Sequence, residues 1–226
     1  MLLMGIDDAG RGPLIGPMVL TGVLLDAKDE PKLRTIGAKD SKMLSHPERV
    51  RLSSLIKKEV KKSSIVLATP EEIDRAVNST NLNTLEAKKM AEVINNLNDK
   101  KTKTRVIVDC PSINTVKWRE KLLSFIQHPD NLEVLCEHKA DANHPSVSAA
   151  SILAKVEREE QVAKIKSVYG NIGSGYPADP FTQTFLKGHG ARLRDSGIFR
   201  KSWATWKTMF PEDNLKSKKN KSLLDY

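Results

Sequence analysis

The sequence of 226 residues is 39% hydrophobic and 29% charged, values that are usual for a globular protein with one large domain. Its 37 lysines and arginines exceed the 28 aspartates and glutamates, and the net charge of +9 favours a polyanionic partner, nucleic acid first. Two cysteines are too few for a disulfide framework, and none of the five histidines form the His-x-x-x-His spacing of a zinc site. The sequence has no long apolar run and no signal peptide, which predicts a cytoplasmic protein without a membrane segment.

The first half of the chain is predicted to begin with two strands. Residues 2–6 are apolar and form a short buried strand that ends at Asp7, and residues 18–25 form the second strand. The glycines and prolines between them predict a rigid turn. Ser45 with Glu48 three residues later is a capping box that starts a helix with apolar spacing to Val60. The following elements are a strand over 64–68, a helix beginning at Thr69 and a helix over 82–97.

The second half alternates strands and helices. The predicted elements are a strand over 105–109, a helix over 115–126, a strand over 132–136, a long helix over 146–169, a glycine-rich loop over 170–177, short helices over 182–186 and 202–210, and a polar tail over 214–226. Strands come first and then alternate with helices, so the order predicts an α/β fold with a mixed sheet.

Carboxylates stand where the predicted strands end. These residues are Asp7, Asp8, Asp109 and Asp141. One acid after a strand is usually a polar turn residue, but two adjacent acids after a buried strand are harder to explain in that way. Clustered carboxylates repel one another, and a hard divalent cation such as Mg²⁺ relieves the repulsion. Two such ions can activate water against a phosphodiester, so the set predicts a metal-dependent nuclease.

The segment Gly10-Arg11-Gly12 follows the first two acids. Its glycines let a ligand approach the main chain, and Arg11 offers a planar fork for phosphate. The spacing to Gly16 is one residue too long for a dinucleotide-binding loop, and no Gly-Lys-Ser/Thr follows as in a Walker A loop. A plain tight turn is the alternative interpretation.

Five further residues are candidates for substrate contact. Lys42 lies in a loop and can pair with phosphate as a point charge. Ser148, Ser151 and Lys155 share one face of a predicted helix, and Tyr176 is an aromatic in a constrained loop that can stack on a sugar or base. The alternatives are a solvated lysine, the polar side of a packed helix and a half-buried packing tyrosine.

Taken in order, these segments resemble ribonuclease HII, the type 2 ribonuclease H family, and most closely its archaeal members. The resemblance covers almost the whole chain, from Met4 to Phe210. The matching strings are Gly5-Ile6-Asp7-Asp8-Ala9-Gly10-Arg11-Gly12-Pro13, Asp40-Ser41-Lys42-Met43-Leu44, Val108-Asp109, Lys139-Ala140-Asp141, Ser148-Ala149-Ala150-Ser151-Ile152-Leu153-Ala154-Lys155, Gly173-Ser174-Gly175-Tyr176-Pro177-Ala178-Asp179-Pro180 and Arg200-Lys201-Ser202-Trp203.

The resemblance implies a ribonuclease H-like mixed sheet flanked by helices, with a small C-terminal helical extension. The implied domains are a catalytic domain over 1–170, the extension over 171–212 and a basic tail over 213–226. The implied activity is hydrolysis of RNA in RNA/DNA hybrids and incision 5′ of ribonucleotides in duplex DNA, by a monomer that uses Mg²⁺ or Mn²⁺ and leaves 3′-hydroxyl and 5′-phosphate ends.

The family's site residues are carried over by the same motifs. The four catalytic, metal-binding acids correspond to Asp7, Asp8, Asp109 and Asp141. The residues that read the ribose 2′-hydroxyl correspond to Gly10, Arg11, Gly12 and Tyr176, and this hydroxyl is the group that distinguishes RNA from DNA.

This chain departs from the family in one acid. The family usually carries Asp-Glu where this sequence has Asp7-Asp8, so the second carboxylate is shorter by one methylene. A catalytically weak nucleic-acid-binding module is one alternative, suggested by the net charge and by Asp8. A related metal nuclease for ordinary DNA is another, although Tyr176 and Gly10-Arg11-Gly12 argue against it. The segment from Asn220 to Tyr226 faintly resembles a peptide that binds a sliding clamp, and a frayed basic tail is its alternative.

Overall fold

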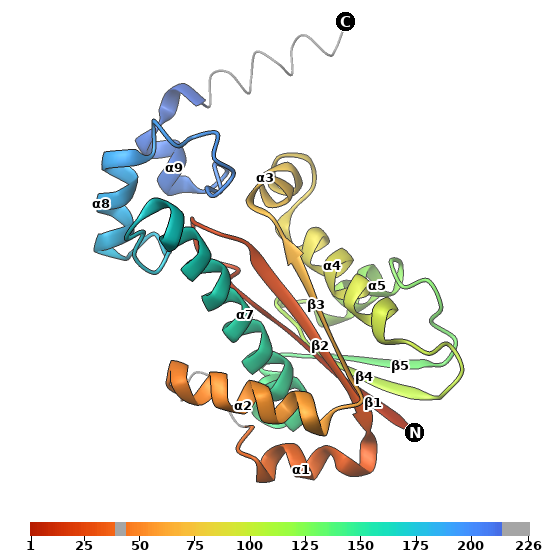
Figure 1. The fold of residues 1–226 in the computed structure, drawn as a ribbon. Helices are drawn as coiled ribbons and strands as arrows, with labels where there is room; N and C mark the ends of the chain where they lie inside the picture. Colours follow the sequence, from red (N-terminus) through yellow and green to blue (C-terminus); the bar gives the residue numbers. More distant parts are fainter. Residues whose placement is uncertain (39–43, 214–226) are drawn as a thin grey trace, which may run out of the picture. The chain divides into compact units, whose positions relative to one another are not determined.

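The computed structural model describes residues 1–38 and 44–213 (Figure 1). Its strands are β1 (Leu2–Ala9), β2 (Met18–Asp26), β3 (Lys62–Ala68), β4 (Thr104–Asp109) and β5 (Leu132–Glu137). Its helices of eight or more residues are α2 (His46–Glu59), α3 (Pro70–Ser79), α4 (Leu82–Leu97), α5 (Thr115–Leu123), α7 (Pro145–Tyr169) and α8 (Pro180–His189). Its shorter helices are η1 (Ala27–Asp29), α1 (Glu30–Thr35), α6 (Ala140–Asn143) and α9 (Ala204–Met209).

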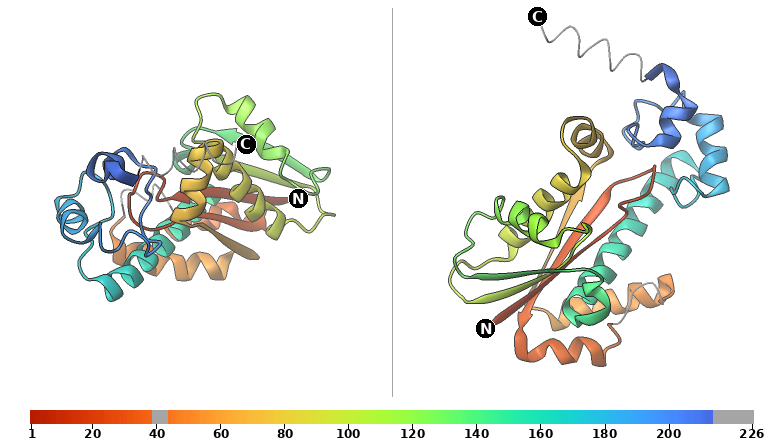
Figure 2. Two further views of the ribbon diagram at one scale, coloured as in Figure 1. Left: turned by 90° about the horizontal axis from the view of Figure 1, so that it is seen from above. Right: turned by 180° about the vertical axis from the view of Figure 1, so that it is seen from behind.

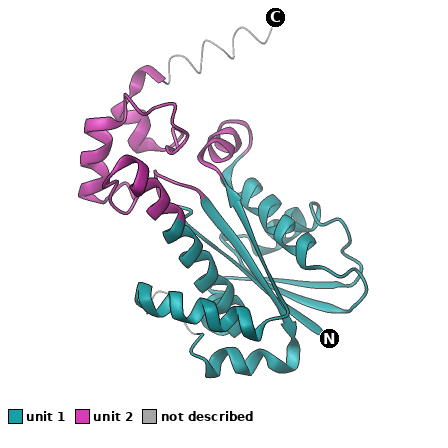
Figure 3. Cartoon of the chain, in the orientation of Figure 1, with its two compact units in different colours: residues 1–11, 18–68, 81–160 teal, residues 12–17, 69–80, 161–226 magenta. Residues whose placement is uncertain are grey.

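The chain divides into two compact units that alternate along the sequence (Figure 3). Unit 1 consists of Met1–Arg11, Met18–Ala68 and Asn81–Glu160. Unit 2 consists of Gly12–Pro17, Thr69–Thr80 and Gln161–Tyr226. The division into domains over 1–170 and 171–212 stays a prediction, because these compact units are defined by contacts and not by function.

The five strands form one sheet in unit 1, in the order β3-β2-β1-β4-β5. β1 and β2 are antiparallel, as are β2 and β3, whereas β4 is parallel to both β1 and β5. The sheet is therefore mixed, and the predicted α/β fold with flanking helices is confirmed.

Helices cover both faces of this sheet. The Thr21 hydroxyl donates to the carbonyl of Ala150 in α7 at 2.6 Å. The next residue, Gly22, faces α4, since a Cβ there would meet Val93 at 2.6 Å. Successive residues of a strand point to opposite faces, so α7 and α4 lie on opposite sides of the sheet. Figure 2 shows α2 on the side of α7 and α5 on the side of α4.

Local sequence signals account for where most helices begin. Ser45 caps α2, and its backbone N–H donates to the Glu48 carboxylate at 3.0 Å, which confirms the predicted capping box. Thr69 and Glu72 form the same arrangement before α3. The predicted helix over 82–97 has the bounds of α4.

The structure differs from the predicted elements in three places. β1 runs past Asp7 to Ala9, because Asp7 and Asp8 still pair with Thr21 and Leu20 of β2. The short helices η1, α1 and α6 were not predicted, since a single turn leaves little periodicity in a sequence. α9 begins at Ala204 rather than Ser202, and the Ser202 backbone N–H instead donates to Asp74 at 2.8 Å.

Unit 2 has an aromatic core of its own. The rings of Phe199 and Trp206 lie 4.8 Å apart, and those of Trp206 and Phe210 lie 4.5 Å apart. These tilted contacts help to hold α9 in the unit, whose α8 and α9 confirm the two short helices predicted there. Across the two described ranges, no helix is both long and apolar enough to cross a membrane.

Candidate active site

The adjacent acids of β1 point to opposite faces of the sheet. Asp7 forms a side-chain hydrogen bond with Ser151 of α7. Asp8 forms one with Glu86 of α4. Because side chains alternate along a strand, the Asp7 carboxylate faces α7 and the Asp8 carboxylate faces α4.

Asp109 lies on the same face of the sheet as Asp7. β1 and β4 pair in parallel through Ile6 and Val108, so the next residues, Asp7 and Asp109, are neighbours across the two strands. Asp109 Oδ1 accepts a hydrogen bond from the backbone N–H of Ala140 at 2.9 Å, and Asp141 is the following residue.

A left-handed residue precedes the short helix that carries Asp141. Lys139 has a φ of 56°, which turns the chain from the end of β5 into the short helix α6. Asp141 is in the first turn of that helix and is only 6% exposed. The hydrogen bond from Ala140 thus links the turn that carries Asp141 to Asp109, although the two segments are far apart in the sequence.

The acids repel one another in the absence of a cation. Burial, and then the carboxylates of Asp8 and Asp109, hold the pKa of Asp7 well above its usual range. Burial and the Glu86 carboxylate do the same to the pKa of Asp8, with Arg11 acting in the opposite direction. Such a cluster is stabilised by positive charge, and oxygen ligands suit a hard divalent cation.

The acids do not form a closed metal cage. Within residues 1–38 and 44–213, no group of three or more His, Cys, Asp or Glu side chains is arranged so that it could hold an ion by itself. Asp7 and Asp8 point to opposite faces of β1, although the charge of Asp8 still acts on Asp7. Their chemistry still fits a divalent ion that keeps several waters, as Mg²⁺ does.

Glu86 is a site residue that the sequence interpretation missed. It is completely buried, and burial raises the pKa of Glu86 to about 7. A signal for it was present in the sequence. Glu86 occupies the apolar stripe that continues through Met90, Val93 and Leu97 of α4, a position where a charged residue is rarely found without a partner.

The partner of Glu86 is Arg11. Arg11 Nη1 forms an ion pair with the Glu86 carboxylate, and Nη2 donates to Asn83 Oδ1 at 2.7 Å. Gly10, directly before it, has a φ of 84°, a value that favours glycine. The sequence predicted that the guanidinium of Arg11 binds phosphate. In the structure, two of its nitrogens instead bind side chains of α4.

The other predicted contact residues differ in their accessibility. Ser148 and Ser151 are buried in α7, and the hydroxyl of Ser151 bonds with Asp7. Lys155 is half-buried on the same helix. Their contact with substrate stays a prediction. Lys42 lies outside the described residues, as does the segment from Asn220 to Tyr226.

In unit 2, Gly12 lies against Tyr176. A Cβ added to Gly12 would lie 3.6 Å from Tyr176 Cε1, and the Tyr176 side chain is exposed enough to meet a ligand. The indole N–H of Trp203 donates to the carbonyl of Gly12 at 3.0 Å. Gly12 and Tyr176, which the sequence predicted to recognise the ribose together, are therefore neighbours. Trp203 contacts Gly12 through a hydrogen bond.

The loop that carries Tyr176 is fixed by hydrogen bonds. The carbonyl of Gly175 accepts from the backbone N–H groups of Leu14 and Ile15 at 2.8 and 3.2 Å. The Thr182 hydroxyl accepts from the Gly175 N–H at 3.0 Å and donates to the Ile172 carbonyl at 2.9 Å. These bonds fix the backbone of the loop on both sides of Tyr176.

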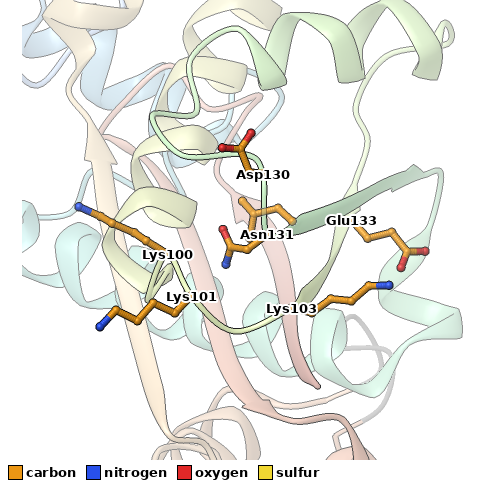
Figure 4. A pocket seen from close by; sticks show the side chains of 7 residues that line it. Lys100, Lys101, Lys103, Asp130, Asn131 and Glu133 are labelled. Atoms are coloured by element: carbon orange, nitrogen blue, oxygen red, sulfur yellow. The ribbon is translucent and has the colours of Figure 1, made fainter.

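A pocket of unit 1 lies away from the acids. Lys103 and Asn131 are among its lining residues, next to the amino ends of β4 and β5, whereas Asp109 ends β4 (Figure 4). Figure 4 shows Lys103 extending toward Glu133, while Lys100 and Lys101 point the other way. The lysines do not converge on one point, and the pocket is separate from the candidate active site.

The chain is similar to known proteins over almost all of its length. The family model for ribonuclease HII matches residues 4–206. A ribonuclease HII of Pyrococcus furiosus is 41% identical over 226 residues, which cover 100% of this chain and 97% of the relative. The crystal structure of ribonuclease H2 from Pyrococcus horikoshii OT3 has a TM-score of 0.85 at 36% identity and covers 94% of this chain and 98% of that one. A chain in the PCNA:RNase HII complex from Archaeoglobus fulgidus has a TM-score of 0.79 at 36% identity and covers 90% and 95%.

Proposed function

The chain belongs to the ribonuclease HII family, and we propose that Asp7, Asp8, Asp109 and Asp141 carry its chemistry. Membership of this family makes it an endoribonuclease that acts on RNA/DNA hybrids. We further propose which residues are catalytic and which substrate the enzyme prefers. The enzyme incises 5′ of single ribonucleotides in duplex DNA and leaves 3′-hydroxyl and 5′-phosphate ends.

One observation carries the assignment of the acids. Asp7 and Asp109 are neighbours on one face of the sheet, and the Asp109 carboxylate helps to hold the pKa of Asp7 above its usual range. Asp141 follows directly after the residue whose N–H donates to Asp109. A purely structural role would not require several poorly solvated carboxylates side by side, because their repulsion costs stability.

We propose Mg²⁺ or Mn²⁺ as the cofactor of these four aspartates. Asp8 points to the other face of β1, but its charge still acts on Asp7 and it is itself affected by Asp109, so it belongs to the same cluster of negative charge. A bound divalent ion supplies an activated water and charge stabilisation for the leaving oxygen of the phosphodiester. The chain itself orients the carboxylates. Ser151 holds Asp7 and the Ala140 N–H holds Asp109, so both acids are positioned before substrate arrives.

Recognition of the ribonucleotide is assigned to Gly10, Arg11, Gly12 and Tyr176. The support is that Gly12 has no side chain between its backbone and the Tyr176 ring, and that Tyr176 is 43% exposed. Backbone groups at a glycine can approach a ribose closely, and an aromatic ring can stack on the sugar. Lys42, Ser148, Ser151 and Lys155 remain candidate contacts to the substrate backbone.

The deciding experiment is incision of a DNA duplex that contains one ribonucleotide, with Mg²⁺ and Mn²⁺ compared. We expect a single cut 5′ of the ribonucleotide, and none in the same duplex without it. Asp141→Asn should abolish the cut yet retain binding. A wild type that binds the hybrid but never cuts it would indicate a binding module, and cleavage of plain DNA would indicate a different nuclease.

We also propose a sliding clamp as partner of a monomeric, cytoplasmic enzyme. The support is the clamp-like segment from Asn220 to Tyr226, together with the complex of PCNA with the similar protein from Archaeoglobus fulgidus. Deletion of residues 219–226 should abolish retention on immobilised clamp while leaving incision unchanged. Equal retention of the shortened and full chains would rule this partner out.

A further inference from the structure

Arg11 is held by the side chains of α4. One guanidinium nitrogen pairs with Glu86, and another donates to Asn83 Oδ1 at 2.7 Å. Both partners lie in the first two turns of α4, more than seventy residues away in the sequence. The arginine of the Gly10-Arg11-Gly12 segment is therefore attached to the helix layer on the Asp8 side of the sheet.

Burying the Glu86 carboxylate for its ion pair with Arg11 costs free energy. Glu86 has no exposed surface, and transferring a carboxylate out of water costs several kcal/mol unless a partner compensates it. A hydrophobic residue would suit the apolar stripe of α4 at that place better. The helix instead presents an acid and an amide whose acceptors match the planar fork of Arg11.

We infer that Glu86 and Asn83 are positioning residues for ribonucleotide recognition: they hold the side chain of Arg11 and, with it, the main chain of Gly10 and Arg11. This inference rests on the proposed function, which makes that segment part of the site that reads the ribose. In this arrangement the charge of Arg11 is compensated by Glu86 and contributes little to phosphate binding.

Two measurable quantities separate a positioning role from a phosphate contact. A side chain that neutralises a phosphate releases counterions, so its removal lowers the salt dependence of binding by about one charge and weakens all sequences alike. A side chain that positions the recognition segment changes the preference for a ribonucleotide and leaves the salt dependence as it was. The experiment measures both.

The test uses the full-length protein in EDTA, where no cleavage occurs. Binding is measured over a range of salt for two duplexes, one with a single ribonucleotide and one of DNA alone. For Arg11→Gln we expect the preference for the ribonucleotide to fall about tenfold, which is the size of a lost hydrogen bond to a charged group, with an unchanged salt slope. For Glu86→Gln we expect the same loss of preference, with equal or tighter binding of plain DNA because Arg11 is no longer neutralised.

Further variants separate positioning from folding. Asn83→Ala removes only the half-buried acceptor and should lower the preference in a protein that melts like the wild type. Glu92→Gln and Asn96→Ala change side chains of the same helix that bond with Lys89 and Ser64, and they should leave the preference unchanged. Arg11→Lys keeps the charge but not the fork, so it should resemble Arg11→Gln.

The outcomes are distinct. A wild type that incises the ribonucleotide duplex while Asn83→Ala and Glu86→Gln keep their full preference overturns this inference alone. A salt slope that falls by about one charge in Arg11→Gln also overturns it, because Arg11 is then a phosphate ligand. A wild type that never incises that duplex overturns the proposed function and this inference with it.

Discussion

Adjacent aspartates in a β-strand cannot face the same side of a sheet, and this constraint gives Asp7 and Asp8 different surroundings. Asp7 lies beside Asp109 and Ser151, on the face covered by α7. Asp8 lies beside Glu86 and Arg11, on the face covered by α4. The two acids were interpreted from the sequence as one strand-end pair, but each is held by a different helix.

Asp8→Glu is expected to remain active. The change adds one methylene to a carboxylate that already contacts Glu86, so it alters the reach of the acid and not its charge. We expect the ratio of the incision rates with Mg²⁺ and Mn²⁺ to change by less than about tenfold, the effect of roughly 1.4 kcal/mol on the barrier. Complete loss of incision in a protein that melts normally would mean that the site requires the shorter acid.

At the scale of elements, the sequence predicted what local chemistry determines. The apolar spacing of α4 and the capping box of α2 gave helices that the structure confirms. α6 depends on the left-handed turn at Lys139 and on a hydrogen bond to Asp109, thirty-one residues away. Contacts between distant segments have no signature in a local window, and the pairing of Arg11 with Glu86 was missed for the same reason.

Gly5→Ala tests how α7 is seated on β1. A Cβ at Gly5 would lie 2.5 Å from the backbone nitrogen of Val147, so the start of α7 would have to move. We expect a loss of about 2–3 kcal/mol in the free energy of unfolding, the upper part of the usual range for overpacking, measured by urea denaturation. Gly188→Ala is the matched control, because nothing lies within 4 Å of that position and alanine favours a helix. Equal stability of both variants would contradict the close packing at Gly5.

Trp203→Phe tests the element that holds Gly12 in unit 2. The variant keeps an aromatic ring but loses the indole N–H that donates to the Gly12 carbonyl at 3.0 Å. We expect the KM for a duplex with one ribonucleotide to rise about fivefold, the effect of one neutral hydrogen bond, with little change in the thermal midpoint.

Trp206→Phe is the control, because we expect it to lower stability and leave the KM unchanged. Its indole N–H donates to Asp213 at 2.9 Å, and its ring is fully buried in the core of unit 2. The smaller ring should lower the free energy of unfolding by about 1–3 kcal/mol, because it leaves a space in the core. The KM of the folded fraction should stay unchanged. A similar rise in KM for both variants would show that Trp203 acts only through the stability of the unit.

For the molecule as a whole, the order of the motifs was sufficient to predict the family, whereas the role of the four acids stays a prediction and their mutual geometry was not predicted. Asp7, Asp109 and Asp141 come from β1, β4 and α6, and only the strand order brings β1 next to β4. The net charge of +9 is consistent with a nucleic-acid substrate but says nothing of where it binds. The sequence therefore predicted the family and suggested which acids act, and it left unpredicted which residues hold them.

The buried acids make the stability of the whole chain depend on pH and on metal. The pKa values of Asp7 and Asp8 are raised by burial, and burial raises that of Glu86 to about 7. An acid whose pKa is higher in the folded state stabilises the fold fully below its unfolded pKa, and this contribution is lost as the pH rises through the folded value. In EDTA, the thermal midpoint should therefore fall as the pH rises from about 5 to 8.

A divalent metal should oppose this fall, because it compensates the ionised carboxylates. At a concentration one hundred times its Kd, Mg²⁺ or Mn²⁺ would add about 2.7 kcal/mol to the free energy of unfolding. This corresponds to a rise of the thermal midpoint of about 5–10 °C at pH 8 and to a much smaller rise at pH 5.

Asp179 is an acid whose pKa is shifted in the opposite direction. Hydrogen bonds from Ser174 lower the pKa of Asp179 to about 2, so its contribution is already complete above pH 5 and adds no slope. Asp7→Asn should show a shallower fall in EDTA and a weaker response to metal. A midpoint that rises with pH in EDTA, or that responds equally to metal at pH 5 and pH 8, would contradict the assignment of these acids to a cation site.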